Sequence, residues 1–239
     1  MINERTASRM VIRKAGWLAL ACLGLSMAAE IWAESGELRL NELDYFETRG
    51  VNVLAFSNWY NGMFDDSKIS GIEIIHHGVR TVTNGDVRLH ATPEQWDAIP
   101  QFVEREVDKD GNRIVAHLRY PDYGFEYAIE TAAEGDSVRI TVRLPEPLPE
   151  ALQGRAGLNL EFLPAAYFGK AWLADDRNGL FPLYPTGPNE HASGVAPVPL
   201  ATGRRITLAP GDAERRITVA SENAELALFD GRAKAQNGW

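Results

Sequence analysis

The sequence has 239 residues, of which 45% are hydrophobic and 24% charged, and its formal net charge is −9. An acidic surface without a basic cluster repels phosphate backbones, so we expect neither nucleic acid nor an anionic membrane surface as a partner. The single cysteine excludes a disulfide framework.

The first 33 residues predict a signal peptide. Basic residues between Arg5 and Lys14 precede an apolar run over residues 17–27, and small residues follow up to Ala33. We expect cleavage there and a secreted or periplasmic product. The apolar run is short for the roughly 20 residues that span a bilayer, so no membrane association is expected after cleavage. The alternatives are a retained anchor and lipid attachment at Cys22.

Removal of residues 1–33 takes away four of the 24 Lys and Arg and two of the 33 Asp and Glu, which leaves a net charge of −11. Residues 34–239 then predict a single antiparallel β-sandwich domain, because apolar and polar residues alternate with the period of a half-buried strand. The alternating segments are residues 38–40, 51–54, 86–90, 114–118, 125–129, 138–144, 158–162, 205–208, 216–219 and 225–229. The turn signals between strands are residues 84–86, 110–112, 134–136, 211–212 and 230–231.

Two stretches depart from the strand pattern. A capping residue, a proline and a glutamine in the order Thr92, Pro93, Gln95 predict one short helix from Thr92 to Ala98. Recurrent proline and glycine predict a long surface loop over residues 181–203. Residues 235–239 have the composition of a turn leading into a further strand, so we expect the domain to be truncated at its C-terminus.

No motif of an enzyme, a metal site or a cofactor site stands out. The adjacent carboxylates Asp65-Asp66 and Asp175-Asp176 lie beside turn formers and have the character of solvated turn residues. Neighbouring residues of a strand point to opposite faces, so His76 and His77 cannot easily share a metal, and we expect one of them to be buried and hydrogen-bonded. Catalytic residues, a metal and a cofactor are therefore all expected to be absent.

Aromatic residues beside Gly, Pro or Asn give a further signal. Flat rings at a loop-lined rim stack on the apolar faces of sugars, and this pattern predicts carbohydrate binding. The alternative is that the rings cover the ends of the core. The candidate residues are Trp59, Tyr60, Tyr167, Trp172 and Tyr184.

Several longer segments give the chain a resemblance to a known family. They are LNELDYFE at 40–47, GVNVLAFSNWYNGMF at 50–64, GIEIIHHGVRT at 71–81, TPEQWD at 92–97, GLNLEFLP at 157–164 and LFDGR at 228–232. In this order they resemble the N-terminal β-rich region of bacterial secreted glycoside hydrolase family 9 (cellulase-like) proteins.

The resemblance implies a non-catalytic module of an exported polysaccharide-degrading hydrolase, which contributes glycan binding or serves as a scaffold for the catalytic domain. In that family the chemistry belongs to a helical barrel with an Asp-Ala-Gly-Asp-type motif, which this chain lacks, so no catalytic residue is carried over. The implied fold is a galactose-mutarotase-like supersandwich. The implied partners are a carbohydrate of β-glucan type and a catalytic domain outside this chain.

Two other functions stay open. The first is a free-standing epimerase or lyase, with His90 or His117 and Glu161 as acid and base. The second is a structural interaction module that docks an exposed apolar patch on another domain.

Overall fold

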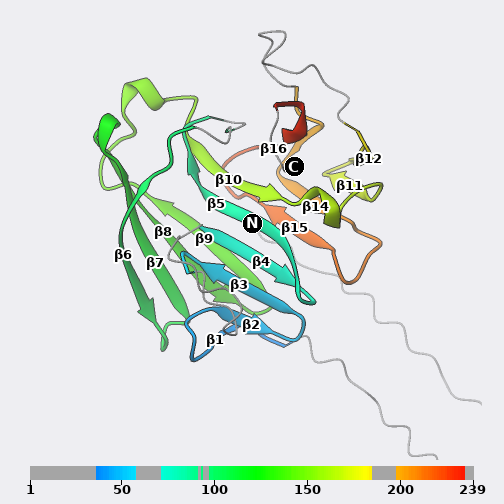
Figure 1. Ribbon diagram of the computed structural model, residues 1–239, viewed down its shortest axis with the longest axis horizontal. Helices are drawn as coiled ribbons and strands as arrows, with labels where there is room; N and C mark the ends of the chain where they lie inside the picture. Colours follow the sequence, from blue (N-terminus) through cyan, green and yellow to red (C-terminus); the bar gives the residue numbers. More distant parts are fainter. Residues whose placement is uncertain (1–35, 58–70, 91–92, 94–96, 185–197, 235–239) are drawn as a thin grey trace, which may run out of the picture. The chain divides into compact units, whose positions relative to one another are not determined.

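The computed structural model describes residues 36–57, 71–90, 93, 97–184 and 198–234 (Figure 1). These residues form sixteen strands and four short 3₁₀ helices, and every recorded strand pairing is antiparallel. The all-β, antiparallel, sandwich-like fold expected from the alternating pattern is confirmed, whereas the supersandwich stays a prediction. None of the helices in these ranges is long and apolar enough to cross a membrane.

A six-stranded sheet with the order β1-β2-β3-β4-β5-β10 forms the middle of the fold. Its strands are β1 (Arg39–Leu40), β2 (Phe46–Thr48), β3 (Val51–Ala55), β4 (Ile72–His76), β5 (Val79–Arg88) and β10 (Gly157–Phe162).

A four-stranded meander packs on one face of the six-stranded sheet. Its strands are β6 (Gln101–Asp108), β7 (Arg113–Tyr120), β8 (Phe125–Glu134) and β9 (Ser137–Arg143). Side chains from the two sheets form one core, in which Phe46 and Ile72 of the six-stranded sheet join Ile129 of the meander. Each of these three is fully buried or nearly so, as expected for sheets stacked face to face.

The C-terminal strands cover the other face of the six-stranded sheet. The strands β12 (Arg177–Leu180), β11 (Ala171–Ala174), β14 (Arg205–Leu208) and β15 (Ile217–Ala220) form one sheet in this order, and β13 (Ala201–Gly203) pairs with β16 (Leu226–Leu228). A second core joins Val82 and Phe162 of the six-stranded sheet to Trp172 and Leu208. Figure 1 shows the meander in green and the C-terminal strands in yellow to orange beside the blue and cyan strands between them.

The helical content is small. The four 3₁₀ helices are η1 (Pro121–Tyr123), η2 (Glu150–Leu152), η3 (Pro164–Ala166) and η4 (Gly231–Lys234). Most of the helix expected from Thr92 to Ala98 lies outside the described residues, and Asp97 and Ala98 are not helical. The middle of the expected loop over residues 181–203 also lies outside them, and β13 occupies its last three residues.

The turn signal at residues 84–86 is wrong as a turn, because β5 continues through it. In the pairing of β5 with β10, Asn159 pairs with Asp86 and Glu161 with Thr83, so Asn84 and Gly85 of β5 both stand opposite Leu160 of β10. This arrangement is a β-bulge, where two residues face one. Asn84 adopts a positive φ of 52°, and a Cβ on Gly85 would lie 2.7 Å from the Cβ of Ile72, so the bulge explains both residues.

Candidate binding site

The aromatic residues selected from the sequence do not form a common rim among the described residues. Trp59 and Tyr60 lie outside these residues. Tyr167 and Trp172 are buried, with 0% and 8% of their surfaces exposed, and only Tyr184 is open, at 78%. Two of the five candidates are therefore core side chains with no free ring face for a sugar.

Packing explains why these two rings are inside. The Tyr167 ring stands edge-on to the Phe162 ring, with centroids 5.9 Å apart. The Trp172 ring covers Gly179 on the neighbouring strand β12, where an added Cβ would lie 2.3 Å from the ring. Both rings belong to the second core, which was the alternative interpretation of the aromatic pattern.

The candidate acid and base residues are not assembled into one site. His117 lies on β7 of the meander and pairs with Glu106 at 3.4 Å. Glu161 lies on β10 of the six-stranded sheet and accepts a hydrogen bond from Asn84 at 2.7 Å. His90 contacts Arg155 at 3.2 Å. Each group has its own neighbour, so the geometry does not support a shared acid–base role.

One histidine of the pair is buried and the other exposed, as expected, but only His76 lies on the strand, because β4 ends there and His77 follows with a positive φ of 47°. His76 is buried and its Nδ1 lies 3.3 Å from the Thr81 hydroxyl, whereas His77 is exposed in the turn after β4. Burial, with Arg215 and then His77 as further causes, lowers the pKa of His76 to about 4. No group of three or more possible metal ligands occurs in the described part of the chain.

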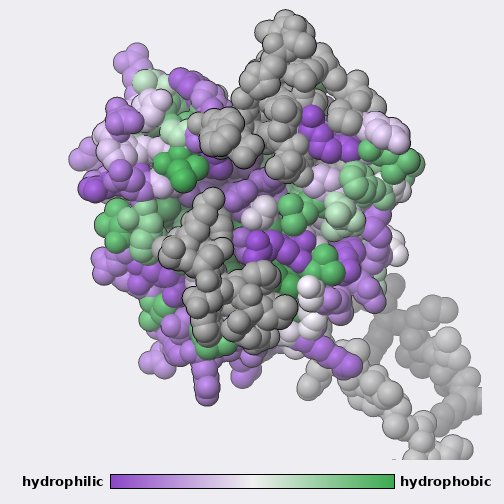
Figure 2. Space-filling model, in the orientation of Figure 1, coloured by the Kyte–Doolittle hydropathy of each residue, from purple (hydrophilic) through white to green (hydrophobic). Residues whose placement is uncertain are grey.

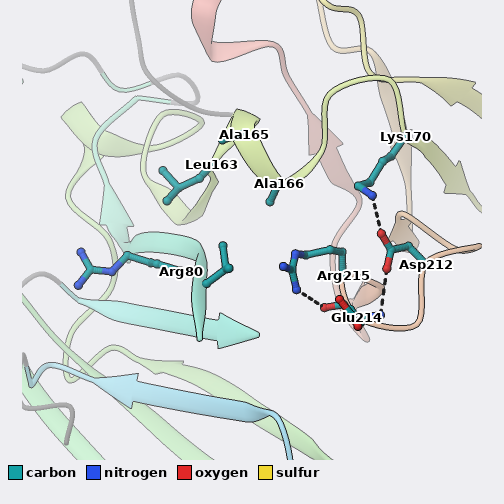
Figure 3. Close-up of a pocket in the computed structure, with 9 residues that line it drawn as sticks. Arg80, Leu163, Ala165, Ala166, Lys170, Asp212, Glu214 and Arg215 are labelled. Carbon is teal, nitrogen blue, oxygen red and sulfur yellow. Dashed lines mark hydrogen bonds and ion pairs between the residues drawn. The ribbon is translucent and has the colours of Figure 1, made fainter. Parts of the chain in front are cut away.

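A pocket of about 480 Å³ lies at the end of the β4–β5 hairpin (Figure 3). Three parts of the chain form it: the start of β5, the segment around η3, and the loop between β14 and β15. The lining residues are Val79, Arg80, Leu163, Ala165, Ala166, Lys170, Asp212, Glu214 and Arg215. We call this space the charged pocket.

Asp212 is the fixed acceptor of the charged pocket. Its Oδ2 accepts a short charge-assisted bond from Lys170, and its Oδ1 accepts the main-chain N–H of Glu214 at 3.0 Å. The hydrogen bond from Lys170, followed by the Glu214 N–H and the charges of Lys170 and Arg215, holds the pKa of Asp212 below its usual value. The carboxylate is therefore ionised and held in one orientation.

Arg215 enters the charged pocket from the same loop. Its Nη1 donates to the main-chain oxygens of His76 at 3.3 Å and Glu214 at 2.9 Å. The buried Tyr167 hydroxyl donates to the carbonyl oxygen of Arg215 at 3.4 Å. Figure 3 shows the Arg215 side chain between the strand that carries Arg80 and the loop that carries Asp212.

Arg80 extends from β5 at the opposite side of the pocket. It forms an ion pair of 3.1 Å with Glu73, whose side chain is only 1% exposed. Glu73 also accepts a hydrogen bond from Thr83 at 3.1 Å. A buried carboxylate needs such partners, so Arg80 has a structural role beneath the pocket as well as a place in its wall.

A second hollow, of about 560 Å³, lies over the N-terminal strands. Apart from Lys109 it is lined by one short segment, residues 40–47, and its Glu47 already accepts a hydrogen bond from Asn41 at 3.1 Å. On the face seen in Figure 2, described hydrophobic residues lie in separate groups among hydrophilic ones. Neither this hollow nor the face in Figure 2 has a set of fixed donors and acceptors like that of the charged pocket.

The sequence did not point to any lining residue of the charged pocket. It did point to Tyr167, whose hydroxyl contacts the main chain of the lining residue Arg215. The charged residues of the pocket belong to no motif, and the bond between Arg215 and His76 joins residues 139 positions apart. Comparison with models of known families, with curated proteins and with solved structures gave no match. The resemblance to family 9 thus stays a prediction.

Proposed function

We propose that this chain is a non-catalytic carbohydrate-binding module of an exported polysaccharide-degrading hydrolase, and that a sugar binds in the charged pocket. The catalytic domain would lie outside this chain. The observation that carries the proposal is the charged pocket itself, an open hollow of about 480 Å³ that is lined by charged donors and acceptors. Small-molecule sites usually measure about 300–1,000 Å³.

The chemistry of the pocket suits hydroxyl groups. Sugar hydroxyls both donate and accept, and Lys170, Asp212 and Arg215 offer charged partners of both kinds. Val79 and Leu163 supply apolar surface for the C–H groups of a sugar ring. The hydrogen bonds from Lys170 and from the Glu214 N–H hold Asp212 in place before a ligand arrives, which lowers the entropic cost of binding.

The carboxylates argue against hydrolysis in this pocket. Glycoside hydrolysis uses two facing carboxyl groups, one of them protonated with a raised pKa. The pKa of Asp212 is lowered instead, so this group is a poor proton donor. Among the described residues, the carboxyl group with a clearly raised pKa is Asp86, and it does not line the pocket.

The test is a titration of the full chain with cello-oligosaccharides, mixed-linkage glucan, xylan and acidic oligosaccharides. Calorimetry or NMR detects the binding. We expect binding of at least one glycan, and we expect Asp212→Ala to weaken it at least 10-fold, because Lys170 and the Glu214 N–H then lose their acceptor. Asp122→Ala, an exposed acid on η1, is the matched control and should bind as the unsubstituted chain does.

Absence of binding to every glycan at millimolar concentration would overturn the carbohydrate-binding role and leave the scaffold role. Equal weakening by Asp212→Ala and Asp122→Ala would place the binding site outside the charged pocket.

A further inference from the structure

We propose that the sugar in the charged pocket carries a carboxylate, as a uronic acid does, and that the Nε and Nη2 edge of Arg215 binds it. This inference rests on the proposed carbohydrate-binding function and narrows its ligand class. A neutral β-glucan has no carboxylate, so the proposal moves the expected ligand from neutral to acidic glycans.

The hydrogen bonds of Arg215 leave one edge of its guanidinium unused. Both recorded side-chain bonds, to His76 O and Glu214 O, start from Nη1. No bond from Nε or Nη2 and no ion pair of Arg215 is recorded within the described ranges. These two N–H groups are parallel and spaced to match the two oxygens of a carboxylate, so they form the bidentate pair for which arginine is suited.

The contacts of Arg215 with neighbouring residues orient this edge of the guanidinium before a ligand binds. The main-chain oxygens of His76 and Glu214 fix the Nη1 side of the guanidinium, and the Tyr167 hydroxyl fixes the main chain of the same residue. Because the pKa of His76 is lowered to about 4, its ring is neutral at pH 7 and adds no competing charge. In Figure 3 the Arg215 side chain lies between Arg80 on one side and Lys170 and Asp212 on the other.

The other charges of the pocket are largely compensated. Arg80 pairs with the buried Glu73 at 3.1 Å, and Lys170 pairs with Asp212. Asp212 is thereby occupied on both oxygens, so it does not need Arg215 as a partner. This leaves Arg215 as the cation available to an incoming anion.

The net charge of the pocket is opposite in sign to the net charge of the chain. Three cations and two carboxylates line the pocket, whereas the whole chain has a net charge of −9. A positive site on an acidic protein attracts an anionic ligand selectively. The exposed Glu214 is the one lining carboxylate without a recorded side-chain partner in the described residues, and it disfavours highly charged ligands over a single carboxylate.

The experiment compares acidic sugars with their neutral counterparts on the full chain. The probes are glucuronic and galacturonic acid and their short oligomers, with glucose, galactose and matched neutral oligomers as references. We expect at least one acidic probe to bind 10-fold or more tightly than its neutral counterpart. Arg215→Gln should remove this preference, and Arg215→Lys should keep only part of it, because a lysine cannot form the bidentate pair.

Arg216→Gln is the control for the charge change, because Arg216 is the exposed neighbour in the sequence and does not line the pocket. It should retain the acidic preference. Equal loss in Arg216→Gln and Arg215→Gln would overturn the proposal in favour of general electrostatic attraction. Far-UV circular dichroism verifies that each variant is folded.

The comparison of acidic with neutral probes on the unsubstituted chain tests the carboxylate preference even if a variant fails to fold. Equal affinity for acidic and neutral probes would overturn the carboxylate inference while the carbohydrate-binding function stands. If no probe and no oligosaccharide binds, the proposed function itself fails.

Discussion

A buried carboxylate on β5 should lower the stability of the folded protein as the pH rises, which is the opposite of the usual effect of a carboxylate. Asp86 is 9% exposed, and its Oδ1 accepts hydrogen bonds from the Tyr127 hydroxyl at 2.8 Å and the Val87 N–H at 2.7 Å. Burial raises its pKa from 3.8 to about 6, although these two bonds and the charge of Arg88 act in the opposite direction. The folded state therefore holds this proton more tightly than the unfolded chain.

The size of the effect follows from the two pKa values. A pKa of about 6 in the folded state against 3.8 in the unfolded state, at about 1.4 kcal/mol per pKa unit, corresponds to about 3 kcal/mol. The stabilisation that protonated Asp86 provides is complete below pH 3.8 and is lost as the pH rises through about 6. At pH 7 the folded protein therefore carries the full cost of a buried charge at Asp86.

The perturbation that reveals this cost is Asp86→Asn. An asparagine is neutral, and its side-chain oxygen can accept the same two hydrogen bonds, so the variant should be about 3 kcal/mol more stable than the unsubstituted chain at pH 7 and only about 0.5 kcal/mol more stable at pH 4. Urea unfolding of both proteins at the two pH values measures these differences, in which the titration of all other groups cancels.

Asp122→Asn is the matched control, because Asp122 is exposed on η1 and should give nearly equal stabilities at both pH values. A difference between Asp86→Asn and the unsubstituted chain that is the same at pH 4 and pH 7 would refute the raised pKa. Destabilisation by Asp86→Asn at pH 7 would refute the view that the buried charge is costly.

Two further variants test the packing and the link between the sheets. In Gly179→Ala the new Cβ would lie 2.3 Å from the Trp172 ring, whereas in Gly157→Ala it would meet no atom within 4 Å, so thermal unfolding should show a cost of about 1–3 kcal/mol for the first and little change for the second. Arg105→Met removes the donors to the main-chain oxygens of Ala55 on β3 and of Asp44 in the turn before β2, at 2.8 and 2.5 Å. It should cost about 2–4 kcal/mol in urea unfolding. The exposed Arg119→Met should cost little, and equal costs would contradict this assignment.

The strand pattern was readable from the sequence because it depends on neighbours along the chain. Residues 205–208 alternate and form β14 with those bounds, and the segment 138–144 became β9 at Ser137–Arg143. The bulge at Asn84 and Gly85 was not readable in the same way. Asn-Gly is a common turn sequence, and only the register of β10 opposite it distinguishes a bulge from a turn.

The candidate site was not predictable because its parts come together only through the fold. The sequence favours Tyr167 as a candidate because it lies close to Gly169, a position that is equally common for rings that close a core. Strands of three or four residues, such as β11 and β12, are too short to establish an alternating pattern. Without these strands, nothing in the sequence indicates that Lys170 and Asp212 are partners.

The relation between Tyr167 and Arg215 connects the core with the proposed binding function. Tyr167 cannot stack on a ligand, since it is fully buried, yet its hydroxyl contacts the carbonyl oxygen of Arg215. The second core thus supports the loop whose side chains line the pocket. Lys170, Asp212 and Arg215 are half-buried and can be exchanged without opening that core, whereas a change at Tyr167 alters packing and loop position together. Ligand preference should therefore be assigned by substitutions in the lining, because loss of binding in a Tyr167 variant would not separate recognition from folding.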